Sequence, residues 1–132
     1  RDGYGIKALR HAGVEVAVIT GRRSEIVQQR MASLTVPYIY QGQENKLAAF
    51  AELQQKLALE ASQIAFIGDD LADWAVMQHC GLSVAVQDAH PYLALHADYR
   101  CKLPGGFGAV RELCDLLLTS QGKFAEFSGS ST

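Results

Sequence analysis

Ile64-Ala65-Phe66-Ile67-Gly68-Asp69-Asp70-Leu71-Ala72-Asp73 joins a short apolar run to three carboxylates. The apolar half is continuous and does not alternate, which is typical of a strand buried on both faces of a parallel sheet. The acidic half stands where such a strand would turn into a helix. The segment therefore predicts the centre of an α/β fold, with polar groups at the carboxyl end of a strand.

Further apolar runs and helical patterns flank this segment. Two runs, at 14–19 and 82–86, resemble the first one, and 37–40 and 97–101 are weaker strand candidates. Amphipathic helical spacing is found at 24–34, 47–57, 71–79 and 110–118. Strand and helix alternate along the chain, which favours a doubly wound, mainly parallel α/β sheet.

Composition narrows the class of partner. The 132 residues carry 48% hydrophobic and 20% charged side chains, as a single globular domain does. A formal net charge of −2 argues against a nucleic-acid or anionic-membrane partner but permits a small anionic substrate. Cys80, Cys101 and Cys114 lack CxxC or zinc-ligand spacing, which indicates reduced thiols of a cytoplasmic protein. No apolar run approaches the roughly 20 residues that span a bilayer.

Two of the strand ends carry groups suited to an anion. Ligands of open parallel sheets bind outside the carboxyl ends of the strands. Thr20-Gly21-Arg22 follows the first strand and offers a hydroxyl and a guanidinium beside a helix N-terminus, which predicts a phosphate site. Lys46 opens the helix after the second strand, against the helix dipole, which indicates an anionic partner. A turn capped by Thr20 and a solvated lysine are the alternatives.

The three carboxylates at the next strand end suit a metal ion. Hard oxygen ligands on a rigid strand end fit Mg²⁺, which takes one or two carboxylates beside waters and substrate phosphate. The alternative is a helix cap followed by acids that favour the dipole. That alternative explains Asp70 or Asp73, but not two adjacent acids directly after a buried strand.

The order of Thr20, Lys46 and Gly68-Asp69-Asp70 resembles the haloacid dehalogenase superfamily of phosphatases. Further segments are similar to its 3-deoxy-D-manno-octulosonate 8-phosphate (KDO 8-phosphate) phosphatase family, and the resemblance extends over nearly the whole chain. These segments include Arg1-Asp2-Gly3-Tyr4-Gly5, Tyr40-Gln41-Gly42-Gln43, Asp88-Ala89-His90-Pro91 and Gly108-Ala109-Val110-Arg111-Glu112. The resemblance implies a haloacid-dehalogenase-like fold without a large cap domain. It also implies Mg²⁺-dependent hydrolysis of that sugar acid phosphate through an aspartyl-phosphate, in lipopolysaccharide biosynthesis.

Roles for individual residues follow from the resemblance. Asp69 would ligate Mg²⁺, while Asp70 and Asp73 would help to hold Lys46. Thr20, Lys46 and Asp70 match catalytic positions. The positions that contact substrate are Arg1, Asp2, Gly3, Lys7, Arg22, Arg30 and Lys46. The family also implies a homotetramer in which a neighbouring subunit helps to close each site.

The sequence departs from the family in three ways. Its Asp-x-Asp motif, which supplies the nucleophile and the general acid/base, is absent from these residues. Lys7 replaces a common Arg, and Phe107 stands where a basic residue is frequent. In the family the missing strand is central, so without it the strands at 14–19 and 64–67 would leave backbone groups unpaired. We therefore expect residues 1–126 to form a phosphatase core that lacks its N-terminal nucleophile strand and belongs to a longer protein, and 127–132 to be a flexible tail.

Two other functions are open at this point. A receiver-like signalling module also combines Asp, Thr, Lys and Mg²⁺ on a doubly wound sheet. In receivers the acidic pair precedes Thr and Lys, whereas here it follows them. A non-catalytic assembly subunit is the second alternative, and it applies if no strand precedes Arg1.

Overall fold

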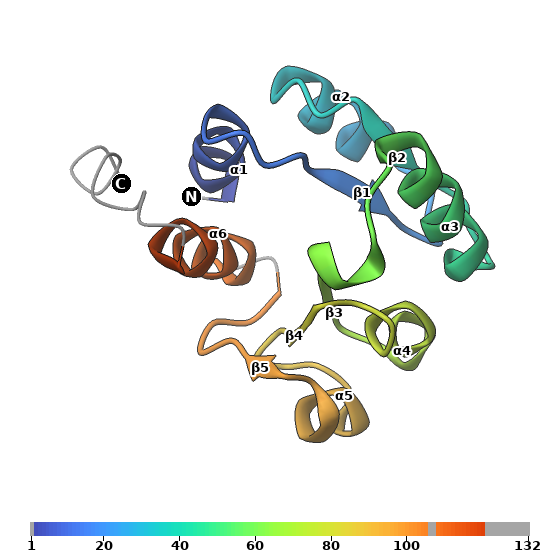
Figure 1. Cartoon of the computed structure of the whole chain (residues 1–132), viewed down its shortest axis with the longest axis vertical. Helices are drawn as coiled ribbons and strands as arrows, with labels where there is room; N and C mark the ends of the chain where they lie inside the picture. The colour runs from blue at the N-terminus through green and yellow to red at the C-terminus, as the bar shows by residue number, and fades with distance from the viewer. Residues whose placement is uncertain (1, 106–107, 121–132) are drawn as a thin grey trace.

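Strands and helices alternate along the chain in the computed structural model, which describes residues 2–105 and 108–120 (Figure 1). The helices are α1 (Asp2–His11), α2 (Glu25–Ser33), α3 (Lys46–Leu57), α4 (Leu71–Met77), α5 (Pro91–His96) and α6 (Ala109–Ser120), with a 3-10 turn η1 (Ala61–Gln63). The strands are β1 (Ala17–Ile19), β2 (Tyr38–Tyr40), β3 (Ala65–Gly68), β4 (Leu82–Ala85) and β5 (Tyr99–Arg100).

All the strand pairs that the structure describes are parallel. β1 pairs with β2, and β3, β4 and β5 form a second sheet in that order. In Figure 1, α1 and α6 lie side by side on one side of the strands, and α3, α4 and α5 lie on the other. The predicted doubly wound α/β architecture is confirmed.

β4 is apolar except at Ser83, whose hydroxyl accepts a hydrogen bond from Asp98, and its apolar residues pack on both faces. Val84 contributes to a cluster with Leu113 of α6, whereas the next residue, Ala85, packs with Met77 and Leu93 on the side of α4 and α5. Successive side chains of a strand point to opposite faces, so a strand covered on both faces needs apolar side chains on both, or polar ones that are hydrogen-bonded as Ser83 is. Val84 and Ala85 are both 0% exposed.

β1 and β3 are less enclosed than β4. Within the described residues each pairs along one edge only, β1 with β2 and β3 with β4. All three residues of β1 are half-buried, as are Ala65, Phe66 and Ile67 of β3. No strand is drawn between β1 and β3 in Figure 1. The expected unpaired backbone at these two strands is therefore present in the described part of the chain.

Two local features differ from the sequence predictions. α5 was not predicted, although Pro91 at its first position and His90, whose Nδ1 accepts the N–H of Tyr92 at 3.1 Å, are both helix-start signals. The strand expected at 97–101 is reduced to two residues. Asp98 N–H donates to Ser83 Oγ and its carboxylate accepts the Ser83 N–H, both at 2.9 Å, so side chains take the place of ladder bonds there.

The expected absence of a membrane span and the expected C-terminal tail remain to be compared with the structure. Among the described residues, no helix has both the length and the hydropathy needed to cross a bilayer. The expected tail, 127–132, lies outside the described residues.

Candidate active site

The acidic segment forms the turn between β3 and α4. Asp70 caps α4, because its Oδ1 accepts the N–H of Leu71 at 2.7 Å. Asp73, one turn into the helix, folds back and accepts the N–H groups of Asp69 (3.0 Å) and Asp70 (3.2 Å) through Oδ2. The capping alternative is thus present in the structure, but it accounts for Asp70 and the fold-back of Asp73 and leaves Asp69 unexplained.

Gly68 makes room for this fold-back. A Cβ built on Gly68 would lie 2.6 Å from the Cβ of Asp73 and 2.9 Å from its Oδ2. Contacts of that length do not occur between real side chains, so a larger residue would displace the carboxylate. The glycine at the end of β3 is therefore required by the position of Asp73.

Lys46 finds its anionic partner in Asp73. The Lys46 Nζ and Asp73 Oδ1 atoms are 2.6 Å apart, and the two side chains are 16% and 4% exposed. Asn45 places the lysine by capping α3, its side chain accepting the N–H of Ala48 at 3.1 Å. Of the two acids expected to hold Lys46, Asp73 makes the contact, whereas the Asp70 carboxylate is turned to its own helix.

Burial alone would raise the pKa of Asp73. The hydrogen bond from Lys46 and the N–H groups of Asp69 and Asp70 outweigh it and hold that pKa below its ordinary value. Asp73 therefore stays ionised and keeps Lys46 in place.

Asp69, unlike Asp73, has no cation paired with it in the described residues. Partial burial raises the pKa of its carboxyl and the neighbouring Asp73 carboxylate raises it further, which outweighs the opposing effect of the Lys46 charge. No ion pair to Asp69 is found in the described residues, and no group of three or more His, Cys, Asp or Glu side chains converges there. An exposed carboxylate beside a second one fits a hard cation such as Mg²⁺, which needs only one or two protein carboxylates. The donor set is therefore suited to the expected metal, for which Asp69 is the predicted direct ligand.

The loop after β1 lies against the loop after β2. Thr20 N–H donates to the carbonyl of Tyr40 at 2.9 Å, and Gln43 N–H donates to the carbonyl of Thr20 at 3.0 Å. The Thr20 hydroxyl oxygen accepts the N–H of Arg22 at 3.2 Å, and Ser24, rather than Thr20, caps α2. Because the second loop leads directly into α3, Thr20 and Arg22 belong to the same edge as Lys46.

Of the remaining expected substrate residues, the structure brings Gly3 and Arg30 together. Gly3 is buried against Arg30 of α2, and a Cβ at Gly3 would overlap the guanidinium Nη2. Lys7 is exposed on α1. In the described part of the chain, no hydrogen bond or ion pair connects these residues to Lys46 or Asp73. Asp2 begins α1, while Arg1 and Phe107 lie outside the described residues.

Sequence reasoning missed two carboxylates that anchor the segment before α6. Glu112 accepts the N–H of Lys102 through Oε1 at 2.9 Å, the N–H of Leu103 at 3.1 Å and the hydroxyl of Tyr99 at 2.7 Å. Asp88 Oδ1 accepts the N–H of Gly105 at 3.0 Å. For Glu112 the sequence did carry a signal, because an acid in the first turn of a helix can accept N–H groups from the loop before it.

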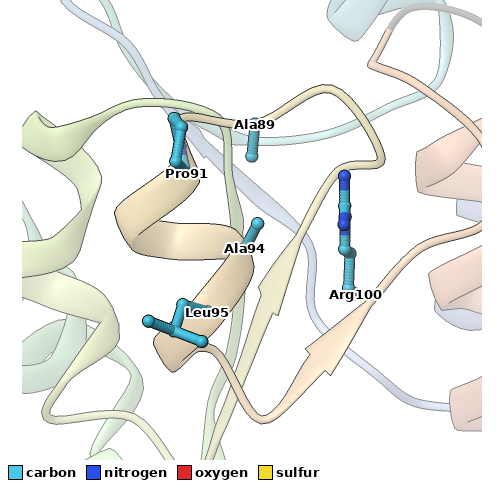
Figure 2. A pocket seen from close by; sticks show the side chains of 5 residues that line it. All are labelled: Ala89, Pro91, Ala94, Leu95 and Arg100. Atoms are coloured by element: carbon cyan, nitrogen blue, oxygen red, sulfur yellow. The ribbon is translucent and has the colours of Figure 1, made fainter.

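A hollow between α5 and β5, away from the acidic turn, has a mainly apolar lining. It has a volume of about 340 Å³ and is lined by Ala89, Pro91, Ala94, Leu95 and Arg100, between α5 and β5 (Figure 2). The Arg100 guanidinium is already bound to the carbonyl of Gln87, with Nη2 at 2.6 Å. None of the predicted site residues lines this hollow, and its apolar wall offers no converging polar groups.

Comparison with known proteins identifies the family. Residues 35–104 match the sequence model of the haloacid dehalogenase-like hydrolases. The chain belongs to this family. The hydrolase is 54% identical over 131 residues to the 3-deoxy-D-manno-octulosonate 8-phosphate phosphatase KdsC of Escherichia coli K12, a match that covers 99% of this chain and 70% of the relative.

Solved structures support the same assignment of the hydrolase. It superposes on the crystal structure of the phosphatase from Yersinia pestis with a TM-score of 0.92 and 50% identity, covering 94% of this chain and 67% of that one. It superposes on the phosphatase from Moraxella catarrhalis with a TM-score of 0.94 and 40% identity, covering 98% and 74%. The Moraxella structure is a complex with a magnesium ion, a phosphate ion and a KDO molecule.

Proposed function

We propose that this hydrolase is a Mg²⁺-dependent phosphatase that releases phosphate from 3-deoxy-D-manno-octulosonate 8-phosphate, in lipopolysaccharide biosynthesis. The observation that carries the proposal is the 2.6 Å pair of Lys46 and Asp73, which fixes an ammonium group beside the unpaired carboxylate of Asp69. A fixed cation next to a metal-binding carboxylate is suited to a phosphoryl group. The relatives from Escherichia coli and Yersinia pestis, at 54% and 50% identity, are phosphatases of that sugar acid phosphate.

Each residue has a task in this proposal. Lys46 donates one of its three N–H groups to Asp73 and keeps the others for phosphoryl oxygens. The hydroxyl of Thr20 donates to the same oxygens. Asp69 would hold Mg²⁺, which when bound supplies charge that polarises the phosphoryl group. Asp70 fixes the start of α4 and thereby the position of the Asp69 backbone.

The sugar acid part of the substrate would meet a second group of residues. These are Arg1, Asp2, Gly3, Lys7, Arg22 and Arg30. Arg22 is exposed at the edge that carries Thr20, where a guanidinium can bind a carboxylate or phosphate through two parallel hydrogen bonds. Arg30 lies against Gly3, which brings α2 and the start of α1 to one surface.

We further propose that residues 1–126 are a core completed by a strand between β1 and β3. Both strands have an unpaired edge and half-buried side chains in the described residues. A parallel strand there would satisfy both edges and end beside Thr20 and Asp69. Its final Asp-x-Asp would supply the carboxylate nucleophile and the proton donor that phosphoryl transfer through an aspartyl-phosphate needs.

The test uses the protein together with whatever residues its gene encodes upstream of Arg1. Phosphate release from 3-deoxy-D-manno-octulosonate 8-phosphate is measured with Mg²⁺ and with EDTA. We expect activity that EDTA abolishes and that Asp69→Asn lowers at least a hundredfold. Asp115→Asn, a matched change on α6, should retain activity. Equal rates in EDTA, or full activity of Asp69→Asn, would exclude the metal assignment, and an inactive protein with no Asp-x-Asp strand would favour a non-catalytic role.

Neither alternative function is favoured by these observations. In the described structure the acids follow Thr20 and Lys46 along the chain, unlike the order in a receiver, and the relatives are phosphatases. An assembly subunit requires no buried Lys46–Asp73 pair.

We also propose that the enzyme acts as a cytoplasmic homotetramer. Three free cysteines suit a reducing compartment, and Ile26 and Leu71, at the starts of α2 and α4, are 79% and 49% exposed. A neighbouring subunit would cover these side chains. Light scattering of the purified protein tests the assembly, and a monomeric mass at micromolar concentration would contradict it.

A further inference from the structure

α2 needs a polar anchor at its N-terminal end. None of its residues is buried. Apolar contacts hold its C-terminal end, where Met31 is partly buried and the C-cap residue Leu34 is 4% exposed in the core cluster shared with α1 and α6. The N-terminal end of α2 is continuous with the loop from Thr20 to Ser24. The backbone of Thr20 is held by Tyr40 and Gln43, so this end of α2 acts on the rest of the loop, including Arg22, whose N–H donates to the Thr20 hydroxyl oxygen.

The side chain of Gln41, directly after β2, supplies this anchor. Its Oε1 accepts the N–H of Ser24, the N-cap residue of α2, at 2.6 Å. Its Nε2 donates to Oε1 of Gln28, in the second turn of the helix, at 3.1 Å. The half-buried Gln41 amide therefore forms hydrogen bonds to α2 at two successive turns, through Ser24 and Gln28.

The chemistry of the partners fixes the orientation of this amide. A backbone N–H only donates, so the atom of Gln41 that faces Ser24 must be the oxygen. The NH₂ group then faces Gln28, whose amide oxygen accepts it. In the native arrangement the Gln41 amide therefore accepts from Ser24 on one side and donates to Gln28 on the other.

The backbone around Gln41 is tied to the same loop. The carbonyl of Gln41 accepts Nε2 of Gln43 at 3.0 Å, and the N–H of Gly42 donates to the carbonyl of Arg22 at 3.0 Å. Gly42 adopts φ +65°, and a Cβ there would lie 2.6 Å from Nε of Arg23. The loop 41–43 is thereby held in one conformation against residues 20–24, which gives the Gln41 side chain a rigid base.

We propose that Gln41 is a positioning residue for the anion-binding loop Thr20–Arg22, acting through Ser24 and Gln28. The inference rests on the proposed phosphatase function, since it assumes that Thr20 and Arg22 contact the substrate. We call the two hydrogen bonds of the Gln41 side chain, to Ser24 and to Gln28, the Gln41 clamp. Small displacements of groups that bind a reacting phosphate reduce catalysis strongly, so loss of the clamp should weaken phosphate binding and raise KM.

The experiment compares Gln41→Ala with a control, Gln29→Ala, which removes an exposed amide from α2. Amide hydrogen exchange is measured at residues 20–28, and binding of inorganic phosphate with Mg²⁺ is followed through the Thr20 and Arg22 amide signals. We expect Gln41→Ala to accelerate exchange at Ser24 at least tenfold and to weaken phosphate binding about tenfold, with a matching rise in KM. Gln29→Ala should leave all three unchanged.

Two carboxylate variants separate the clamp from general packing. In Gln41→Glu the amide of Gln28 can turn and donate to the new carboxylate, and in Gln28→Glu the amide of Gln41 still donates. Each single variant should therefore keep slow exchange at Ser24. The double variant has two acceptors and no donor between them, so it should exchange as fast as Gln41→Ala and bind phosphate more weakly than the single effects multiplied together.

The outcomes distinguish this inference from the proposed function. Unchanged exchange at Ser24 in Gln41→Ala, or purely multiplicative effects in the double variant, overturns the clamp even if the enzyme is active. Fast exchange with unchanged phosphate affinity overturns the positioning role. Absence of phosphate release with intact Gln41 overturns the proposed function, while exchange and phosphate binding still decide the role of Gln41.

Discussion

Lys46 at the start of α3 and Asp73 in α4, 27 residues apart in the chain, form a 2.6 Å ion pair that joins the two helices. The pair is enclosed, with side chains 16% and 4% exposed. Asp73 also accepts two backbone N–H groups from the β3–α4 turn. A single carboxylate thus connects the cation of one helix to the acidic turn of another.

Lys46→Met should destabilise the protein by about 3 kcal/mol, because it leaves the charge of Asp73 buried without its partner. Urea unfolding at pH 7 measures the change. Lys56→Met is the matched control on the same helix, where Lys56 lies 3.8 Å from Glu52 and both side chains are more than half exposed. Equal decreases in the free energy of unfolding in the two variants would show that the Lys46–Asp73 pair stabilises the protein no more than an exposed ion pair does.

Gly68→Ala should displace Asp73 and lower both stability and phosphatase activity. The added Cβ would lie within 2.6–2.9 Å of three Asp73 atoms. Relief of such overpacking typically costs about 1–3 kcal/mol. Gly105→Ala is the control, since the nearest atoms there, on Val86, lie at 3.6 Å. Thermal unfolding and the activity assay would contradict the prediction if the two variants behaved alike.

Much of the fold follows from local patterns. The apolar runs at 64–67 and 82–86, the second interrupted only by Ser83, predicted β3 and β4, because strands of a parallel sheet covered by helices are largely apolar on both faces. Helical spacing likewise predicted α3 and α6. α5 was not predicted because it is six residues long and offers too few turns for a periodic pattern.

The site was predicted in part, for a physical reason. Residues at strand ends can be read directly from the sequence, which is how Thr20 and Asp69 were found. The contact of Lys46 with Asp73 rather than Asp70 depends on helix geometry, and spacing alone does not give it. The contacts of the Gln41 side chain with Ser24 and Gln28 were not predicted, because such contacts leave no periodic signature in the sequence.

Glu112 should make stability depend on pH. Burial by itself would raise the pKa of this carboxyl, but the N–H groups of Lys102 and Leu103 and the hydroxyl of Tyr99 outweigh it, so the pKa lies below the ordinary value of 4.5. A lowered folded pKa means that the stabilisation is complete above pH 4.5 and is lost as pH falls through the folded value.

Glu112→Gln should therefore cost about 1 kcal/mol at pH 7 and progressively less as the pH falls below 4.5. Urea unfolding of both proteins across this range measures the difference. Glu52→Gln, which alters a surface carboxylate more than half exposed, should show no such dependence. A gap between Glu112→Gln and the unaltered protein that is constant with pH would contradict the prediction.

Cys80 should react slowly with alkylating agents although it is only half-buried. All three cysteines are free, and burial raises the pKa of the Cys80 thiol from 9.0 to about 11. Its Sγ lies 3.4 Å from the carbonyl of Val76, to which it donates. Because the thiolate is the reactive form, iodoacetamide at pH 8 should modify Cys80 roughly a hundredfold more slowly in the folded protein than in guanidinium.

Peptide mass mapping measures this rate, which should rise about tenfold for each pH unit between 8 and 10. Cys101 is only 2% exposed, and burial raises the pKa of its thiol to about 11 as well. Its rate therefore shows how much restricted access slows a thiol of similar pKa. If thiolate formation controls the reaction, Cys80 keeps this pH dependence and reacts faster than Cys101. Equal rates for Cys80 in folded and unfolded protein would show that burial does not suppress its ionisation.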